Sequence, residues 1–424
     1  MRTARAEATT PSQVRRHRPD YQIVLYMGLL MLFGLIIMYA IGPQRAQVLN
    51  TLYGTDFYGS TYFFIKQGAS LLLALAAFML CAKIPSGWFG KNARTLLFIG
   101  FGACVVLAIS GWLNLPIAKC SLGACRWFEL GPLGSLQPAE YLKFALLIFV
   151  AYLLGTRVKS GLVNDRDATL IPLAVVVGAA ILFVIGLQKD MGTGAAMLAI
   201  IASMVVAAGI NKKTVLTILG AIVGVGVLLI VIAPHRMERI TTFFAGDTVS
   251  TTGGDTYHIA HAKIAIGSGG FFGVGIGNSV QATGYLPEAI NDSVFAIMGE
   301  TFGFIGLTVI LILFTALLLR VLRVADLLPD MTARLIAVGV FGWLGAHVIL
   351  NVAAMTGILP LTGITLPLLS FGGTSMVFIA GALGLVFQLS RYTNYELTQK
   401  GQHYANTRSG RGVGRTRYAS RRGY

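Results

Sequence analysis

The stretch YQIVLYMGLLMLFGLIIMYAI, residues 21–41, contains no charged side chain. Because an α-helix rises about 1.5 Å per residue, about 20 apolar residues cross the ~30 Å hydrocarbon core of a bilayer. The stretch is too long for the apolar segment of a cleaved signal peptide, and no clear cleavage site follows it. It therefore predicts a helix that crosses the membrane and stays in the mature protein.

Similar apolar runs recur along the whole chain of 424 residues. Hydrophobic residues make up 55% of the composition, charged residues only 12%, and the mean hydropathy is +0.73. A soluble protein of this length needs far more charge to cover its surface, so the composition excludes a soluble globular fold. We predict an all-α polytopic membrane protein of ten spanning helices. They lie near residues 21–42, 61–82, 94–113, 138–156, 168–187, 192–210, 214–234, 293–319, 333–356 and 370–390.

Most of the 33 Lys and Arg residues lie in the two tails and in loops on the same side of the predicted helices. Because basic residues favour the cytoplasmic side, both termini are expected in the cytoplasm. The long loop between the seventh and eighth helices, at about 235–292, is then expected outside. The predicted organisation is a basic cytoplasmic tail at 1–20, a membrane domain at 21–391 and a basic, disordered cytoplasmic tail at 392–424.

The net charge of +16 resides largely in these tails. Cytoplasmic topology and contact with anionic inner-leaflet lipids account for it, so membrane lipids are expected as partners and nucleic acid is not.

The four cysteines fall into two pairs of different character. Cys81 and Cys104 lie in predicted spans and are interpreted as small apolar residues. Cys120 and Cys125 lie in an outer loop, where a disulfide can form in an oxidising compartment, and the sequence leaves this open. Two cysteines alone make a poor zinc site.

Polar residues are costly at membrane depth, so they mark functional sites or paired structural bridges. They gather in four places at the predicted outer surface, and the first contains Arg126, Trp127, Gln137, Glu140 and Lys143. Glu140 and Lys143 lie three residues apart on one helical face and can pair. A structural ion pair is favoured over direct catalysis, although such a pair can also line a substrate cavity.

Two short outer turns form the second and the fourth place. In the turn at 188–193, Asp190 can cap the following helix or form a wall of an outer cavity, and the sequence leaves both open. The apolar loop at 357–375 is broken by Pro and Gly and contains Ser370. Its backbone needs protein partners or a cavity, because lipid cannot satisfy it.

The long loop is the third place. His258 and His261 lie three residues apart without an evident third metal ligand, so a helix-face or hydrogen-bonded pair is favoured. The glycines at 267–277 lack the spacing of a phosphate loop and are interpreted as permitting tight turns and close backbone approach. The loop ends with Asp292, directly before the eighth predicted helix.

Taken in order, these segments resemble the SEDS family (shape, elongation, division and sporulation). The resemblance covers about residues 21–391, and residues 277–281 and 285–289 are closer to its division branch, FtsW, than to its elongation branch, RodA. The matching motifs are Arg126-Trp127, Gln137-Pro138-x-Glu140, Gln188-x-Asp190-x-Gly192-Thr193, Ala265-Ile266-Gly267-Ser268-Gly269-Gly270, Leu286-Pro287-Glu288 with Asp292, Gly299-Glu300, and Leu359-Pro360 through Ser370-Phe371-Gly372-Gly373-Thr374-Ser375.

The resemblance implies a peptidoglycan glycosyltransferase of the bacterial plasma membrane, acting at the division septum. It would polymerise lipid II into glycan strands at the outer face and release undecaprenyl diphosphate. A class B penicillin-binding protein (a transpeptidase) and other division proteins are the implied partners. Mg²⁺ or Mn²⁺ is implied as a cofactor by the resemblance alone.

The family's essential acid matches Asp292 in this chain. The residues expected to contact substrate are Arg126, Trp127, Gln137, Glu140, Lys143, Asp190, Arg236, Arg239, Lys263, Ser268, Asn278, Gln281, Glu288 and Ser370.

The chain departs from the family pattern around this acid. Where the family reads Thr-Asp-Phe-Ile-Phe, the sequence is Asn291-Asp292-Ser293-Val294-Phe295. Lys189 replaces the usual Pro, Ala139 the usual Ser, and Thr301 a common second Glu. The acid is retained, and these changes bear on how the acceptor is positioned.

Asp292 is the candidate general base for the acceptor hydroxyl. A position at a helix N-terminus would lower its pKa, whereas burial would raise it, and the sequence does not decide which effect is larger. The competing interpretation is that Asp292 only caps the helix. Arg126, Arg236, Arg239 and Lys263 are candidates for contact with the departing diphosphate, although Glu129 or Glu238 can pair with them instead.

Two other functions are compatible with the sequence. A lipid II flippase or transporter would use Lys66, Glu140 and Lys143 along a path through the membrane, but the polar residues gather at one face instead of continuing across. A non-catalytic scaffold of a division complex is the other alternative, because the residues around Asp292 are altered.

Overall fold

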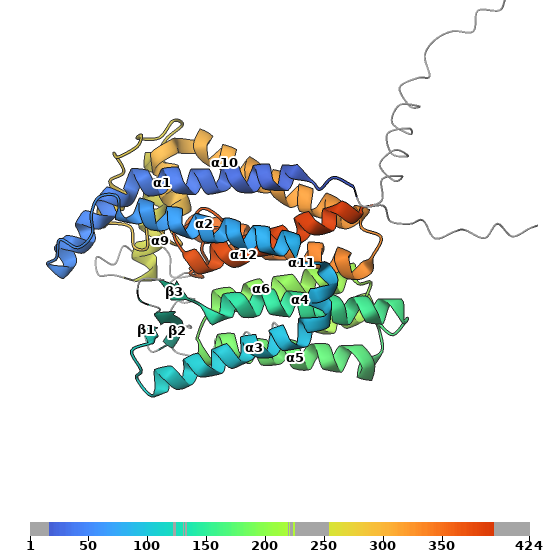
Figure 1. The fold of residues 1–424 in the computed structure, drawn as a ribbon. Helices are drawn as coiled ribbons and strands as arrows, with labels where there is room; N and C mark the ends of the chain where they lie inside the picture. The colour runs from blue at the N-terminus through green and yellow to red at the C-terminus, as the bar shows by residue number, and fades with distance from the viewer. Residues whose placement is uncertain are drawn as a thin grey trace, which may run out of the picture.

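The computed structural model describes residues 17–121, 124–129, 131, 134–218, 220, 224 and 254–393. Its long helices run roughly side by side, and a small sheet lies at one end of the bundle, here called the sheet end (Figure 1). The helices are α1 (Tyr21–Tyr53), α2 (Tyr62–Lys83), α3 (Ser86–Trp112), α4 (Pro138–Lys159), α5 (Ile171–Ile181), α6 (Met191–Ala207), α9 (Asp255–Ser268), α10 (Val294–Leu327), α11 (Met331–Met355) and α12 (Gly373–Leu389). The short helical segments are the π-helices η2 (Arg166–Leu170) and η3 (Leu182–Leu187) and the 3₁₀-helices η4 (Gln281–Thr283) and η5 (Ser390–Tyr392).

Eight helical segments of the described chain are long and apolar enough to cross a membrane. One of them, Arg166–Leu187, joins η2, α5 and η3, and α6 is a shorter apolar helix. Together these nine segments match nine of the ten predicted runs, which confirms a polytopic helical membrane protein. The seventh run, at 214–234, lies mostly outside the described residues, so the number of ten spans stays a prediction.

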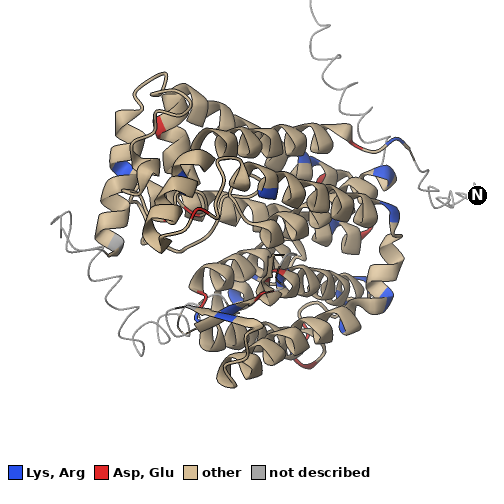
Figure 2. Ribbon diagram, turned by 60° about the vertical axis from the view of Figure 1, so that its left-hand side comes forward, with Lys and Arg blue, Asp and Glu red and all other residues tan. Residues whose placement is uncertain are grey.

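The start and the end of the described chain lie together, at the end of the bundle opposite the sheet (Figure 1). The backbone N–H of His17 donates to the carbonyl of Arg391 at 3.0 Å, and the N–H of Asp20 donates to Ser390 Oγ at 2.9 Å. Asp20 also pairs with Arg320 of α10. Figure 2 shows several basic ribbon segments gathered at this end. This agrees with the prediction that both termini lie on one side, and the tails at 1–16 and 394–424 lie outside the described residues.

Close contacts between helices hold the bundle together. A Cβ atom on Gly384 of α12 would lie 2.3 Å from the carbonyl oxygen of Phe78 on α2, so these helices approach more closely than a larger side chain would allow. α11 packs against α10 on one side and against α4 and α6 on the other. It therefore connects the two groups of helices that Figure 1 shows above and below it.

The small sheet was not predicted and adds a β element to the all-α expectation. Its strands β1 (Ala118–Ser121), β2 (Ala124–Glu129) and β3 (Ser135–Leu136) are antiparallel in the order β1-β2-β3. Cys120 and Cys125 face each other across β1 and β2 and form a disulfide. The pairing that the sequence left open is thus present, and it closes the hairpin on the sheet end of α3.

Candidate functional site

Asp292 lies in the turn that precedes α10, at the sheet end of the bundle. The residue in the N-cap position of α10 is Ser293, and Asp292 makes no hydrogen bond to the second or third N–H of the helix. Its Oδ1 atom is buried without a hydrogen-bond partner. The capping interpretation of Asp292 is therefore not supported, and the carboxyl group has an unused acceptor.

The pKa of Asp292 is raised to about 7. Burial is the main cause, and the negative charge of Glu288 in the same turn adds to it. The N–H groups of Asp292 and Ser293 and the Ser293 hydroxyl act in the opposite direction, because they stabilise the carboxylate. Burial thus outweighs the helix N-terminus, and the group can gain or lose a proton near neutral pH.

Two hydrogen bonds attach the Asp292 turn to the rest of the site. Asn351 of α11 is buried, and its Nδ2 atom donates to the carbonyls of Asp292 and Ile364, each at 2.7 Å. The N–H of Phe371 donates to the carbonyl of Ile290 at 2.8 Å. The turn and the 357–375 loop, far apart in sequence, are therefore held side by side. No role for Asn351 was predicted from the sequence.

The glycines before η4 have a structural explanation. α10 is broken at Gly303, which has φ 66° and ψ −167°. The N–H groups of Val274 and Gly275 donate to the carbonyls of Glu300 and Thr301, which the break leaves without helical partners. The glycines thus permit backbone-to-backbone approach, as predicted.

The Glu300 carboxylate holds the segment that follows these glycines. It is buried and accepts hydrogen bonds from the Ser279 hydroxyl and from the N–H groups of Val280 and Gln281. The Gln281 side chain in turn contacts His261 of α9, with 2.7 Å between Oε1 and Nδ1. Gln281, a predicted substrate contact, is therefore part of a buried structural network.

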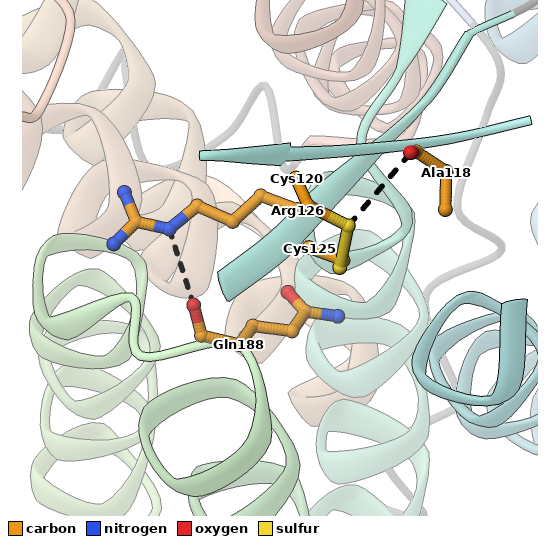
Figure 3. Close-up of a disulfide and its surroundings, with 5 residues drawn as sticks. All are labelled: Ala118, Cys120, Cys125, Arg126 and Gln188. Atoms are coloured by element: carbon orange, nitrogen blue, oxygen red, sulfur yellow. Dashed lines mark hydrogen bonds between the residues drawn. A yellow bond between two sulfur atoms is a disulfide. The ribbon is translucent and has the colours of Figure 1, made fainter. Parts of the chain in front are cut away.

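Arg126 on β2 stabilises the end of the fifth span. Its Nε donates to the carbonyl of Gln188 at 3.1 Å (Figure 3). Its Nη2 donates to the carbonyl of Lys189 at 3.0 Å. The disulfide lies beside it in the same hairpin (Figure 3). A guanidinium is well suited to the free carbonyls of a helix C-terminus, so Arg126 has a clear structural role.

Asp190 is the N-cap of α6, which answers a question that the sequence left open. Its Oδ1 accepts from the N–H of Thr193 at 2.9 Å, and its Oδ2 accepts from the Thr193 hydroxyl at 2.8 Å. Gln137 donates to the same carboxylate at 2.9 Å. These two predicted substrate contacts therefore bind each other and join α4 to α6.

Glu140 and Lys143 form the predicted ion pair, with 2.7 Å between Lys143 Nζ and Glu140 Oε1. Both are buried in α4, and Lys143 Nζ also lies 3.2 Å from His347 Nε2. Trp343 Nε1 donates to the same Nε2 atom, so this nitrogen is an acceptor and the ring proton is on Nδ1. Nδ1 in turn donates to the carbonyl of Thr365.

The other predicted contacts are dispersed. Ser268 and Asn278 bond to backbone carbonyls of their own segments, and Ser370 Oγ accepts from the N–H of Leu366. Lys263 lies on α9 against Gly357. Glu288 is exposed beside Asp292, and Trp127 pairs with Lys119 in the sheet. Arg236 and Arg239 lie outside the described residues.

No metal centre is evident in the part of the chain that the structure describes, where no three His, Cys, Asp or Glu side chains come together. The divalent cation therefore stays an expectation, and no step below depends on it.

Comparison with known proteins identifies the chain's relatives. Residues 21–395 match the family model of the FtsW, RodA and SpoVE proteins, described as cell cycle proteins. Stage V sporulation protein E of Bacillus subtilis is 32% identical, over 90% of this chain and 99% of its own length. A probable peptidoglycan glycosyltransferase FtsW of Nitrosomonas europaea is 31% identical, over 88% of this chain and 93% of its own.

Solved structures share the fold. The rod shape determining protein RodA of Thermus thermophilus has a TM-score of 0.59 and 25% identity, covering 88% of this chain and 97% of that chain. A chain in the structure described as "Structural coordination of polymerization and crosslinking by a peptidoglycan synthase complex" has a TM-score of 0.63 and 23% identity, covering 88% and 98%.

Proposed function

The chain belongs to the FtsW, RodA and SpoVE family of cell cycle proteins, and from this premise we propose that it is a peptidoglycan glycosyltransferase. It polymerises lipid II into glycan strands at the outer face of the bacterial plasma membrane, with Asp292 as the general base. The names of its curated relatives support the activity. The observation that supports the residue is the Asp292 carboxyl group, which has a buried, unpartnered oxygen and a pKa of about 7.

The chemistry needs one proton to leave the acceptor sugar as the new bond forms. The acceptor hydroxyl oxygen attacks the anomeric carbon of the donor, and its proton passes to Asp292. The bond between that carbon and the diphosphate breaks, and its electron pair leaves with undecaprenyl diphosphate. A base with a pKa near the ambient pH is ionised in a substantial fraction of molecules and is basic enough to accept this proton.

The charge on the leaving diphosphate requires basic groups at the same face. Arg126 donates to the carbonyls of Gln188 and Lys189, and these two bonds leave three of its five N–H donors for other acceptors. Lys263 lies on α9, which packs against α10 and α11, and it stays a predicted contact. Arg236 and Arg239 stay predicted contacts.

A transpeptidase of the penicillin-binding class is the proposed partner. The support is the structural similarity to a chain of a peptidoglycan synthase complex, together with the family membership. A role at the division septum follows from the FtsW-like residues of the long loop. Relatives named for division and for sporulation are similarly close, so the branch is part of the proposal.

The first test replaces Asp292 by Asn in the full chain. We expect glycan synthesis from lipid II to fall by about 100-fold or more, because the amide cannot accept the proton. The measurement is a gel of glycan products from purified protein in detergent, with and without the partner transpeptidase. Asp326→Asn, on the exposed end of α10 opposite the sheet, is the matched control and should polymerise at the wild-type rate.

Each other outcome identifies a different error. Near wild-type polymerisation by Asp292→Asn would exclude Asp292 as the base. Movement of lipid II across liposomes without polymer would support a transporter. Stimulation of a partner's synthesis by a chain that makes no polymer would support a scaffold.

A further inference from the structure

A buried hydrogen bond joins α9 to the residue that follows Asp292. His258 Nε2 lies 2.5 Å from Ser293 Oγ, and Ser293 Oγ lies 2.8 Å from the carbonyl oxygen of Pro287. His258 is 8% exposed and Ser293 is fully buried. The three residues come from a helix, a helix N-terminus and a turn, so the bonds cross-link separate segments.

The direction of these bonds follows from the chemistry of the groups. A carbonyl oxygen only accepts, so the single hydroxyl proton of Ser293 is donated to Pro287. Ser293 Oγ must then accept from His258. The proton between them is on Nε2, and His258 is the donor.

Ser293 is also central to the backbone of the turn. Its N–H donates to the carbonyl of Glu288 at 3.3 Å, and its carbonyl accepts from the N–H groups of Ala296 and Ile297 at the start of α10. A rotation at Ser293 would therefore move Asp292 relative to α10. The His258 bond restrains this rotation from outside the turn.

We propose that His258 is a positioning residue for Asp292 and acts on it through the Ser293 hydroxyl. This inference rests on the proposed function, in which Asp292 is the base. Ser293 is one of the positions where the chain departs from the family pattern, so the family resemblance does not imply the pair. His258 orients the hydroxyl and, by donating to it, strengthens the bond that the hydroxyl gives to the Pro287 carbonyl of the Asp292 turn.

The titratable groups near Asp292 decide how a change in pH affects its carboxyl group. Glu288 lies in the same turn, His258 reaches it through Ser293, and Lys263 lies farther along α9 against Gly357. α11 presents the neutral Asn351, and residues 357–372 contain no titratable side chain. The Ser293 hydroxyl lowers the pKa of Asp292, so losing its contribution should raise that pKa.

Two substitutions of His258 separate positioning from general packing. The amide nitrogen of Gln can take the place of Nε2, whereas that of Asn matches Nδ1 and falls short of Ser293. We expect His258→Gln to keep kcat within about threefold, and His258→Asn and Ser293→Ala each to lower kcat about tenfold with little change in KM. The double variant His258→Asn/Ser293→Ala should lose no more than either single variant, because both remove the same interaction.

The pH at half-maximal activity provides a second readout in the same full-length protein. It should move upward in His258→Asn and Ser293→Ala but not in His258→Gln. Equal activity of the Asn and Gln variants would overturn the proposal. Additive losses of kcat in the double variant would also overturn it. A fall in kcat with an unshifted pH profile would do the same, because a loss of folded protein gives that result.

An infrared titration of the Asp292 carboxyl, identified by its absence in Asp292→Asn, tests the pair without any activity. The expected result is a higher midpoint in His258→Asn and Ser293→Ala than in wild type and His258→Gln. If the midpoints shift but Asp292→Asn still polymerises lipid II, the pair is real and the base assignment fails. If they do not shift while Asp292→Asn is inactive, the positioning role fails and the proposed function stands.

Discussion

At the scale of single residues, the environment of Asp292 decides its chemistry. A carboxylate near a helix N-terminus is normally stabilised, which lowers its pKa. Here Asp292 precedes the N-cap residue, one of its oxygens is buried without a partner, and Glu288 lies nearby. Burial and like charge therefore outweigh the helix and the local N–H groups, and the pKa rises to about 7.

Replacing Glu288 by Gln should shift the pH dependence of polymerisation. The Glu288 charge raises the pKa of Asp292, so removing it should lower that pKa and keep the base ionised at lower pH. In wild type we expect activity to fall as the pH drops through about 7, and in Glu288→Gln the fall should occur at lower pH. The measurement is the initial polymerisation rate across neutral pH.

Glu129→Gln is the control for this experiment. Glu129 is exposed in the sheet, where it pairs with Lys119 and has no contact with Asp292. Its profile should superimpose on that of wild type. An identical midpoint in Glu288→Gln and wild type would show that another group controls the pH dependence.

At the scale of elements, the glycine-rich segment and the break in α10 form one unit. The break at Gly303 removes helical hydrogen bonds, and residues 270–275 replace them with their own backbone groups. The backbone N–H groups of Phe304 and Ile305, which follow the break, donate to the carbonyls of Gly270 and Phe271. Such a break is tolerated near the membrane because each freed group finds a protein partner.

Gly273→Ala should destabilise this unit. Gly273 has φ 82°, and a Cβ atom there would lie 2.2 Å from the carbonyl oxygen of Thr301. We expect a loss of about 2 kcal/mol or more in the free energy of unfolding, because strain and a backbone clash coincide. Thermal unfolding in detergent, followed by tryptophan fluorescence, would measure it.

Gly267→Ala is the matched control. Gly267 lies within α9, and a Cβ atom there would meet no atom within 4 Å. Alanine is the better helix former, so this variant should be as stable as wild type or slightly more stable. Equal melting temperatures for both variants would show that the close approach at Gly273 contributes little.

At the scale of the whole molecule, α11 links the candidate base to the buried ion pair of α4. Its residues Trp343, His347 and Asn351 are spaced by four and lie on one helical face. Asn351 binds the Asp292 turn, whereas His347 binds Lys143. The 357–375 loop lies between them and accepts from both, at Thr365 and Ile364.

Lys143→Met should destabilise the whole bundle, since it leaves the Glu140 carboxylate buried without its cation. One oxygen of Glu140 already has no partner. Removing one member of a buried pair typically costs about 3–5 kcal/mol, and replacing both with uncharged residues costs much less. Lys143→Met should therefore lower the melting temperature sharply, and Glu140→Gln/Lys143→Met should recover most of the loss. A double variant as unstable as the single one would contradict this account.

Much of the candidate site was predictable because its residues have strong local signatures. The ion pair between Glu140 and Lys143 follows from their spacing, whereas Asp292 was predicted as the base because it matches the essential acid of the family. The sequence placed Asp190, Arg126 and Gln281 at the correct end of the molecule but did not show that carbonyl groups, helix caps and buried bonds already engage them. The partners of Arg126 and Gln281 are distant in sequence, so spacing carries no signal for them, whereas the partner of Asp190 is Thr193, a near neighbour that the capping interpretation allowed for.

The sequence by itself determined the class of the protein and most of its spans, because the lengths of apolar runs are set by the thickness of the bilayer and need no tertiary contact. It also determined the family, whereas the role of Asp292 stays a prediction. Only the tertiary structure decided that Asp292 has a buried carboxyl oxygen and is not a cap, that the cysteines meet across a hairpin, and that His258 reaches Ser293. These features depend on which segments pack together, and a pKa or a hydrogen bond is a property of that packing.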